Sequence, residues 1–240
     1  MNFIQHYSSS KSNLYEVVGG GAYPRRLLLE CGIRWPKIQE ALNFDLYGID
    51  ACLITHEHQD HCKAVRDVIK AGIDIYSSEG TINSLGLDSE RRAIPAEAGH
   101  NFRPCDAFSV IPFGINHDAA EPFGYLVADL ESDDILFFAP DSGFIKQRFD
   151  VMFSHVAIEC SYDVQIVKRN IKDGLIPAML GKRLLETHAD KETTKRYLDK
   201  FINLEKCRQI HLLHCSEGNL DKEKTKMEFE KRYFIETVII

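Results

Sequence analysis

The most informative stretch of this sequence is Thr55-His56-Glu57-His58-Gln59-Asp60-His61. It directly follows an apolar run, residues 51–54, which we expect to form a buried strand. In an extended segment His56 and His58 project to the same side, because side chains alternate along a strand. Asp60 and His61 then fall where the chain turns into a helix. One strand end and the turn after it can therefore aim two ligands at one metal ion and two at a second.

A polar loop with incidental histidines is the alternative interpretation of this stretch. Imidazole and carboxylate groups are, however, the ligands that borderline divalent metals such as zinc take from proteins. Three imidazoles and the Asp60 carboxylate at this spacing, within six positions, rarely occur together by chance. The stretch therefore predicts a metal site. Zinc and manganese both stay open, since a His-rich site with carboxylates suits either ion.

The motif resembles the HxHxDH signature of the metallo-β-lactamase superfamily. This resemblance implies an α/β fold, a four-layer αββα sandwich of two sheets with helices outside. It also implies a third ligand histidine, a carboxylate that bridges two metal ions and a last histidine near the C-terminus. His117, Asp141 and His214 occupy these places in the family's order, each at the end of an apolar run. The implied metal ligands are His56, His58, Asp60, His61, His117, Asp141 and His214.

Within the superfamily, the chain is similar to the small bacterial WalJ (YycJ) proteins, which are themselves similar to ribonuclease Z. The matching segments include residues 8–13, 27–32, 50–61, 159–163 and 214–219. The similarity implies metal-dependent phosphodiester cleavage and, more narrowly, 5′-to-3′ degradation of DNA. It also implies that Glu159 and His188 form a pair outside the ligand shell that donates the leaving-group proton. This chain has Glu30 where the family usually has an Asp that braces the HxHxDH turn.

The expected chemistry uses two divalent ions, Zn²⁺ or Mn²⁺, that share a hydroxide attacking phosphorus in line with the leaving oxygen. Three histidines suit one ion (His56, His58 and His117), three side chains suit the other (Asp60, His61 and His214), and Asp141 suits a position between both. The predicted catalytic residues are Asp60, Glu159 and His188. Ser216, Asn219 and Lys11 are predicted contacts of a substrate phosphate, although loop serines also commonly cap or turn.

Composition agrees with a soluble globular enzyme of one domain, residues 1–240. The chain is 44% hydrophobic, and no apolar run approaches the length that spans a membrane, so we expect no membrane partner. Seven cysteines without a CxxC pair favour the reducing cytoplasm. A net charge of −7 argues against a broad nucleic-acid-binding surface. It does not exclude a nuclease, because bound dications reverse the charge at the site.

Hydrophobic periodicity predicts short strands in two groups with helices between them. The expected strands are residues 2–6, 14–18, 26–30, 49–54, 73–77, 108–113, 124–130, 135–138 and 155–159. The expected helices are residues 35–42, 63–71, a short one from 81, 193–201 and 222–233. The Gly19–Gly21 triplet is expected in a hairpin turn, because it lacks the helix that a phosphate-binding loop needs.

Several functions besides DNA cleavage stay open from the sequence. RNA cleavage and hydrolysis of small phosphodiesters such as cyclic nucleotides need the same metal chemistry, and the small substrates also need a closed pocket. Thioester or lactone hydrolysis would give Glu159 and His188 no clear task. A binding module that keeps the metals without turnover is disfavoured by the complete ligand set. Association into a homo-oligomer is compatible with the sequence.

Overall fold

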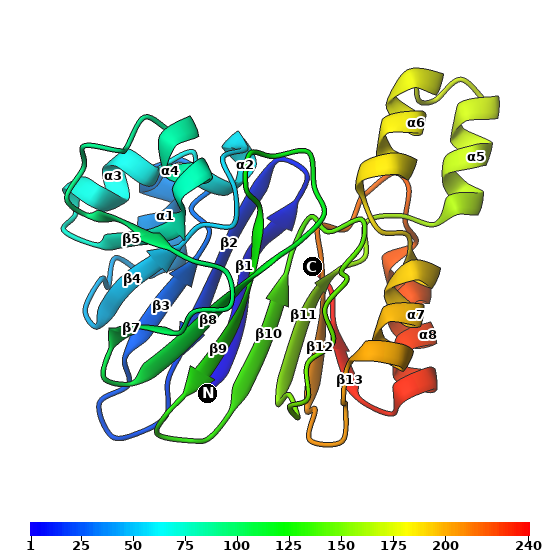
Figure 1. Ribbon diagram of the computed structural model, residues 1–240. Coiled ribbons are helices and arrows are strands. Elements are labelled where there is room, and N and C mark those ends of the chain that lie inside the picture. The colour runs from blue at the N-terminus through cyan, green and yellow to red at the C-terminus, as the bar shows by residue number, and fades with distance from the viewer. The chain divides into compact units, whose positions relative to one another are not determined.

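The computed structural model describes all 240 residues, and the chain divides into two units (Figure 1). Unit 1 consists of Met1–Gly114 and Ala119–Leu136, and unit 2 consists of Ile115–Asp118 and Phe137–Ile240. Each unit buries large apolar side chains of its own, such as Leu28 in unit 1 and Phe153 in unit 2. A single domain over residues 1–240 stays a prediction.

Unit 1 contains a six-stranded sheet in the order β1-β2-β3-β4-β5-β6. Its strands are β1 Asn2–Ser9, β2 Ser12–Val18, β3 Arg26–Leu29, β4 Ile49–Leu53, β5 Asp74–Ser78 and β6 Ala93–Ala96. The first three strands pair antiparallel, and β3 to β6 pair parallel. The amide of Gly19 donates to the carbonyl of Arg25 over 2.9 Å in the connection between β2 and β3. The predicted hairpin at the glycine triplet is therefore confirmed.

The second sheet has seven strands in the order β13-β12-β11-β10-β9-β8-β7. Antiparallel pairing joins β7 Phe102–Cys105, β8 Phe108–Gly114 and β9 Phe123–Asp129, and β10 Ile135–Ala139 follows. In unit 2, β11 His155–Glu159, β12 Gln209–Leu213 and β13 Glu236–Val238 pair parallel. Every residue of β11 is buried, as is usual for a parallel strand covered on both faces.

Four helices belong to unit 1, and three of them cover one face of its sheet (Figure 1). They are α1 Trp35–Ala41, α2 Gln59–Cys62, α3 Val65–Lys70 and α4 Glu79–Ser84. The strands contribute Leu28, Cys52 and Ile75 to a buried cluster with Ile38 of α1 and Val68 of α3. Burial of this apolar surface stabilises the sheet end that delivers the candidate metal ligands.

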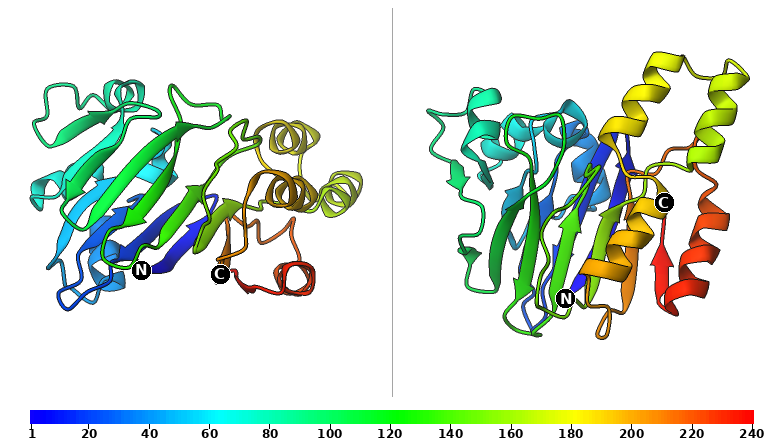
Figure 2. Two further views of the ribbon diagram at one scale, coloured as in Figure 1. Left: turned by 60° about the horizontal axis from the view of Figure 1, so that its bottom comes forward. Right: turned by 45° about the vertical axis from the view of Figure 1, so that its right-hand side comes forward.

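Four further helices belong to unit 2: α5 Val164–Lys172, α6 Ala178–Thr187, α7 Lys191–Phe201 and α8 Lys222–Tyr233. Three of them begin after an aspartate (Asp163, Asp190 or Asp221) whose side chain accepts a hydrogen bond from the first turn. The helices α7 and α8 lie along β11 to β13, and α5 and α6 form a helical hairpin beyond them (Figure 2). No helix of the chain is both long enough and apolar enough to cross a membrane.

Two sheets flanked by helices confirm the predicted α/β class, but several elements were not predicted. The strands β6 and β7 contain Pro95 and Pro104. Proline is found mainly in edge strands, and β6 and β7 are both edge strands of their sheets. The helix α5 is rich in β-branched residues, which have low helix propensity. The helix α6 and the strands β12 and β13 were also missed. The predicted helix over residues 63–71 is α3, separated from α2 by the non-helical backbone of Ala64.

Candidate metal centre

The first cluster of predicted ligands lies in unit 1, where β4 leads into α2. The Nε2 atom of His56 is 3.1 Å from Nδ1 of His58, and the rings of His56 and His61 are 4.1 Å apart. His58 immediately precedes α2, and Asp60 and His61 lie in its single turn. Asp60 Oδ2 approaches His61 Nε2 to 3.2 Å. The structure of unit 1 thus brings together all four side chains of the motif.

Glu30 supports this cluster from the end of β3. Its carboxylate accepts hydrogen bonds from the hydroxyl and the amide of Thr55 over 2.5 and 3.3 Å, and it lies 3.4 Å from His61 Nδ1. Glu30 is completely buried, and burial raises the pKa of its carboxyl, although the contacts with His61 and Thr55 oppose this. Glutamate therefore reaches the brace position that the sequence comparison assigned to it.

Asn13 is a second supporting residue, for which no role was predicted from the sequence. Its buried amide nitrogen lies 3.2 Å from Asp60 Oδ2 and 3.2 Å from His61 Nε2. The same nitrogen donates to the backbone carbonyl of Asp60 over 3.1 Å. Asn13 lies in β2, 47 positions before Asp60, so no local pattern could have indicated this contact.

Gly32 is required for the close approach of two backbone segments in unit 1. A Cβ atom at Gly32 would lie 1.5 Å from the carbonyl oxygen of Asp60. The neighbouring amide of Cys31 donates to the carbonyl of His61 over 2.7 Å. Any side chain at residue 32 would therefore push the turn after β3 away from the metal-binding turn.

The second cluster lies in unit 2 and is centred on Asp141, which follows β10. His117 Nε2 is 3.7 Å from one carboxylate oxygen of Asp141, and His214 Nε2 is 3.4 Å from the other. All three side chains are buried. Burial and the neighbouring His188 lower the pKa of His117, which favours the neutral imidazole that binds metals. The arrangement of one carboxylate between two imidazoles suits a bridging ligand.

Glu159 and His188 lie beside this second cluster. His188 Nδ1 is 2.6 Å from Glu159 Oε1, and the other carboxylate oxygen accepts hydrogen bonds from the amides of Ser142 and Ala189 over 2.7 and 3.1 Å. The ring of His188 stacks on that of His214, with centroids 4.9 Å apart. Burial lowers the pKa of His188, but the ion pair with Glu159 outweighs it and raises the pKa to about 9. The Glu159 carboxylate therefore favours the protonated form of His188.

Three residues of the candidate site adopt left-handed backbone conformations. Glu30, Asp141 and His214 have φ angles of 66°, 42° and 54°, and each stands at or just past the end of a strand. This region is uncommon for residues other than glycine and costs on the order of 1–3 kcal/mol for each residue. Such conformations concentrate at functional sites, where the surrounding structure enforces them.

The three predicted phosphate contacts lie in different parts of the chain. Ser216 and Asn219 are in the loop between β12 and α8, where the Asn219 amide donates to Ser216 Oγ over 3.2 Å. Asn219 also accepts a hydrogen bond from Asn170 over 2.9 Å. Lys11 is exposed in the turn between β1 and β2 of unit 1. Ser216 and Asn219 thus stabilise a loop of unit 2, and a role in binding substrate stays a prediction for all three.

Comparison with known proteins identifies the family. Residues 25–165, more than half of the chain, match the family model described as a beta-lactamase superfamily domain. The chain belongs to the β-lactamase superfamily. This member is 26% identical over 217 residues to the exodeoxyribonuclease WalJ of Streptococcus pneumoniae, which covers 85% of this chain and 78% of that protein. It is also 26% identical over 242 residues to the exodeoxyribonuclease YycJ of Bacillus anthracis, covering 95% of this chain and 87% of that one.

A solved structure confirms the metallo-β-lactamase fold of this superfamily member. The metallo-β-lactamase fold protein YhfI from Bacillus subtilis superimposes with a TM-score of 0.73 at 13% identity, covering 99% of this chain and 95% of that one. The predicted αββα architecture is therefore confirmed. Family membership and the histidine and carboxylate clusters of the two units together support a metal-binding hydrolase.

Proposed function

We propose that this superfamily member is a nuclease that degrades DNA from the 5′ end with the help of two divalent metal ions, Zn²⁺ or Mn²⁺. The main structural support is the unit 2 cluster, in which the two oxygens of Asp141 face different histidines beside the Glu159–His188 pair. Further support comes from the names of the two relatives, both exodeoxyribonucleases that match most of the chain.

The proposed ligand set is the one that the family resemblance implies. One ion would be held by His56, His58 and His117, the other by Asp60, His61 and His214, with Asp141 shared. The donor chemistry fits, because neutral imidazoles and carboxylates are the groups that bind such ions. Burial of His117 favours its neutral form, and Asn13 and Glu30 orient the Asp60–His61 turn. When bound, two such ions would acidify a water molecule and offset charge on the phosphoryl oxygens.

The remaining catalytic task, protonation of the leaving oxygen, is proposed for His188. In the protonated imidazole, Nδ1–H donates to Glu159, so the proton on Nε2 is the one that can pass to the leaving oxygen. Glu159 itself is held by the amides of Ser142 and Ala189, which fixes the direction of the imidazole. A thioester substrate would not need this pair in the same way, because a thiolate is a better leaving group than an alkoxide.

The hairpin of α5 and α6 favours a polyanionic substrate. It carries five exposed basic side chains and two acidic ones, whereas the whole chain has a net charge of −7. The basic residues are Lys168, Arg169, Lys172, Lys182 and Arg183. Arg183 donates to Asp118 over 2.9 Å, and Asp118 directly follows the proposed ligand His117. The helix α6 ends at Thr187, directly before His188. A positively charged surface is therefore joined to the unit 2 cluster, as a nucleic-acid substrate requires.

The test is digestion of end-labelled linear duplex DNA by metal-stripped protein that is resupplied with Mn²⁺ or Zn²⁺. We expect metal-dependent loss of nucleotides from the 5′ end, and no loss with the Asp60→Ala, His61→Ala double variant. Intact DNA with either metal, from protein shown to bind both ions, would refute the proposal for duplex DNA. Cleavage of structured RNA or cyclic nucleotides under the same conditions would redirect it to those substrates. We also propose that the enzyme acts in the cytoplasm, in keeping with its seven cysteines and no CxxC pair.

A further inference from the structure

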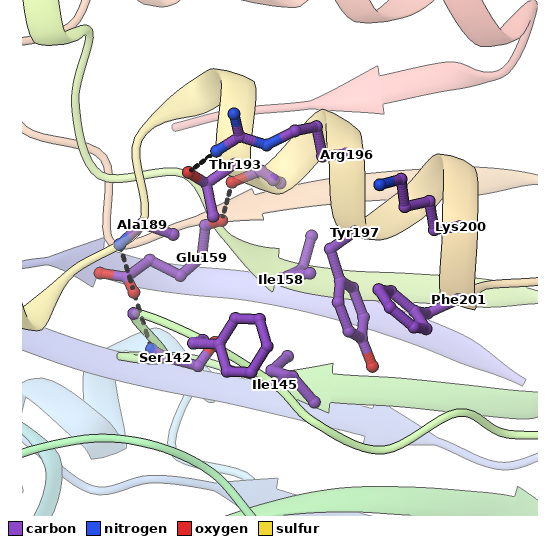
Figure 3. A pocket seen from close by; sticks show the side chains of 13 residues that line it. Ser142, Ile145, Ile158, Glu159, Ala189, Thr193, Arg196, Tyr197, Lys200 and Phe201 are labelled. Carbon is purple, nitrogen blue, oxygen red and sulfur yellow. Dashed lines mark hydrogen bonds between the residues drawn. The ribbon is translucent and has the colours of Figure 1, made fainter.

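Unit 2 contains a cavity of about 260 Å³ between the segment after β10 and one face of α7 (Figure 3). Its apolar surface comes from Phe144 and Ile145 of that segment, Ile158 of β11, and Tyr197 and Phe201 of α7. The proposed chemistry uses none of these side chains. Because the volume is slightly below the usual range for ligand pockets, roughly 300–1,000 Å³, the cavity suits one planar ring system of a larger ligand.

The aromatic side chains of the cavity form a prepared surface for a planar ligand. The rings of Tyr197 and Phe201 are stacked, with centroids 5.3 Å apart. The Tyr197 hydroxyl donates to the carbonyl of Gln147 over 3.0 Å, which fixes that ring. Phe144 is 49% exposed although it is a large apolar side chain. A flat ligand lying against Phe144 would remove this surface from water.

Two cations line the same cavity. Arg196 and Lys200 are one turn apart on α7, and both belong to the lining of the cavity; the guanidinium of Arg196 lies beside Thr193 (Figure 3). Arg196 also donates to Thr193 over 2.8 Å, which orients its guanidinium. Glu159 is the acidic residue of the lining, and its carboxylate is bound by His188 and two backbone amides. The cavity therefore combines aromatic stacking surface with positive charge.

The cavity adjoins the proposed catalytic groups through its own lining. Ser142, one residue after the ligand Asp141, contributes to its wall. Glu159, which holds His188, contributes at the same end, whereas Phe201 lies at the opposite end in Figure 3. A ligand in the cavity would thus extend from the Glu159–His188 pair along α7.

We propose that this cavity binds one nucleotide of the DNA strand, with the base against Phe144, Tyr197 and Phe201 and a phosphate near Arg196 and Lys200. The inference rests on the proposed nuclease function and adds a substrate position to it. Aromatic stacking accepts every base, so such a site would hold the strand without sequence preference. It would bind the strand beside the proton donor and so contribute to KM rather than to the chemical step.

The first experiment measures binding of deoxyadenosine monophosphate to the full chain by titration calorimetry, which needs no nuclease activity. We expect Phe144→Ala and the double variant Arg196→Gln, Lys200→Gln each to weaken binding by about tenfold or more. The controls are Phe234→Ala and Lys231→Gln, two exposed side chains of unit 2 outside the lining. All substituted side chains are exposed, so unchanged melting temperatures would show that each variant folds.

The second experiment compares steady-state digestion of a normal strand with that of strands carrying one abasic nucleotide at successive positions. On the normal strand, Phe144→Ala should raise KM about tenfold with kcat unchanged. On the strand whose abasic nucleotide falls in the cavity, wild type and variant should have the same KM. Wild-type nucleotide binding by both cavity variants would overturn the inference, even if the enzyme digests DNA. Weakened binding in both variants, without any DNA digestion, would keep the nucleotide site and refute only the nuclease. If inorganic phosphate binds as tightly as the nucleotide and Phe144→Ala has no effect, base recognition is refuted.

Discussion

The two units supply their ligands in different ways. In unit 1, four ligand side chains lie within His56–His61, on one strand end and the single turn of α2. In unit 2, His117, Asp141 and His214 come from three segments far apart in the chain, and Glu159 and His188 from two more. The first cluster is local in sequence, whereas the second exists only after the strands of unit 2 have paired.

This difference indicates which substitutions should disrupt each ligand cluster. Backbone geometry aims the ligands of unit 1, and Glu30, Asn13 and the close approach at Gly32 brace them. Asp141 organises the ligands of unit 2, since both histidines face its carboxylate. A substitution at Asp141 should therefore affect more of the site than any single substitution in the HxHxDH turn.

Removal of Asp141 is expected to have the largest effect. If its carboxylate is shared by both ions, Asp141→Ala should leave at most one ion per chain and lower kcat/KM by about 10³-fold or more. The Asp60→Ala, His61→Ala variant should keep the ion that is held by His56, His58 and His117. Metal content by mass spectrometry and the DNA digestion rate test this, with exposed Asp150→Ala as control. Two ions bound to Asp141→Ala with wild-type affinity would contradict the bridging role.

Replacement of His188 should have the next largest effect and leave the metals in place. His188→Gln removes the proposed proton donor, so DNA cleavage should fall by about 10²–10⁴-fold. A nitrophenyl phosphodiester, whose leaving group needs no proton, should be cleaved at close to the wild-type rate. The two substrates are compared in one assay with metal content measured. An equal loss on both substrates would mean that His188 positions a ligand or binds metal itself.

Loss of the Glu30 brace should have an intermediate effect confined to unit 1. Glu30→Gln keeps the size of the side chain but removes the charge facing His61, and we expect metal affinity to fall by about 10–100-fold. Glu30→Asp keeps the charge and should lose less. Competition with a chelator of known affinity measures both variants. Equal losses for Gln and Asp would show that length rather than charge determines the brace.

The smallest effects concern stability in acid. In unit 1, burial raises the pKa of Glu16, but hydrogen bonds from His6 and Arg26 outweigh it and lower the pKa overall. The pKa of Glu228 in unit 2 is lowered by Lys195 and Lys191, again against burial, but this carboxylate is more exposed. A lowered folded-state pKa adds stability that is complete above the unfolded pKa of about 4.3 and is lost as pH falls below it.

Denaturant unfolding from pH 7 to pH 3 measures this contribution. Glu16→Gln should remove about 1 kcal/mol of the stability lost on acidification, and Glu228→Gln should remove less because solvent screens its ion pairs. If Glu228→Gln reduced the loss of stability between pH 7 and pH 3 more than Glu16→Gln does, the assignment of the stronger carboxylate interaction to Glu16 in unit 1 would be contradicted.

The amount that could be predicted from sequence also differs between the two clusters, because the first is local in the chain and the second is not. His56 to His61 and the strand before them form a local pattern, because the short segment after β4 and the single turn of α2 hold all four side chains within six positions. The family order supplied His117, Asp141 and His214 as candidates. Their arrangement around one carboxylate depends on strand pairing over long separations, which no local pattern contains.

The sequence by itself determined the superfamily, the α/β class and the identity of the candidate ligands, because these depend on residue type and short spacing. Only the tertiary structure revealed the contact of Asn13 with the ligands, the left-handed backbone at Asp141 and His214, the basic hairpin of α5 and α6, and the cavity along α7. Each of these depends on residues that are distant in the chain and meet only when apolar surfaces pack together. Packing of this kind is decided by the shape of the whole unit and not by any one segment.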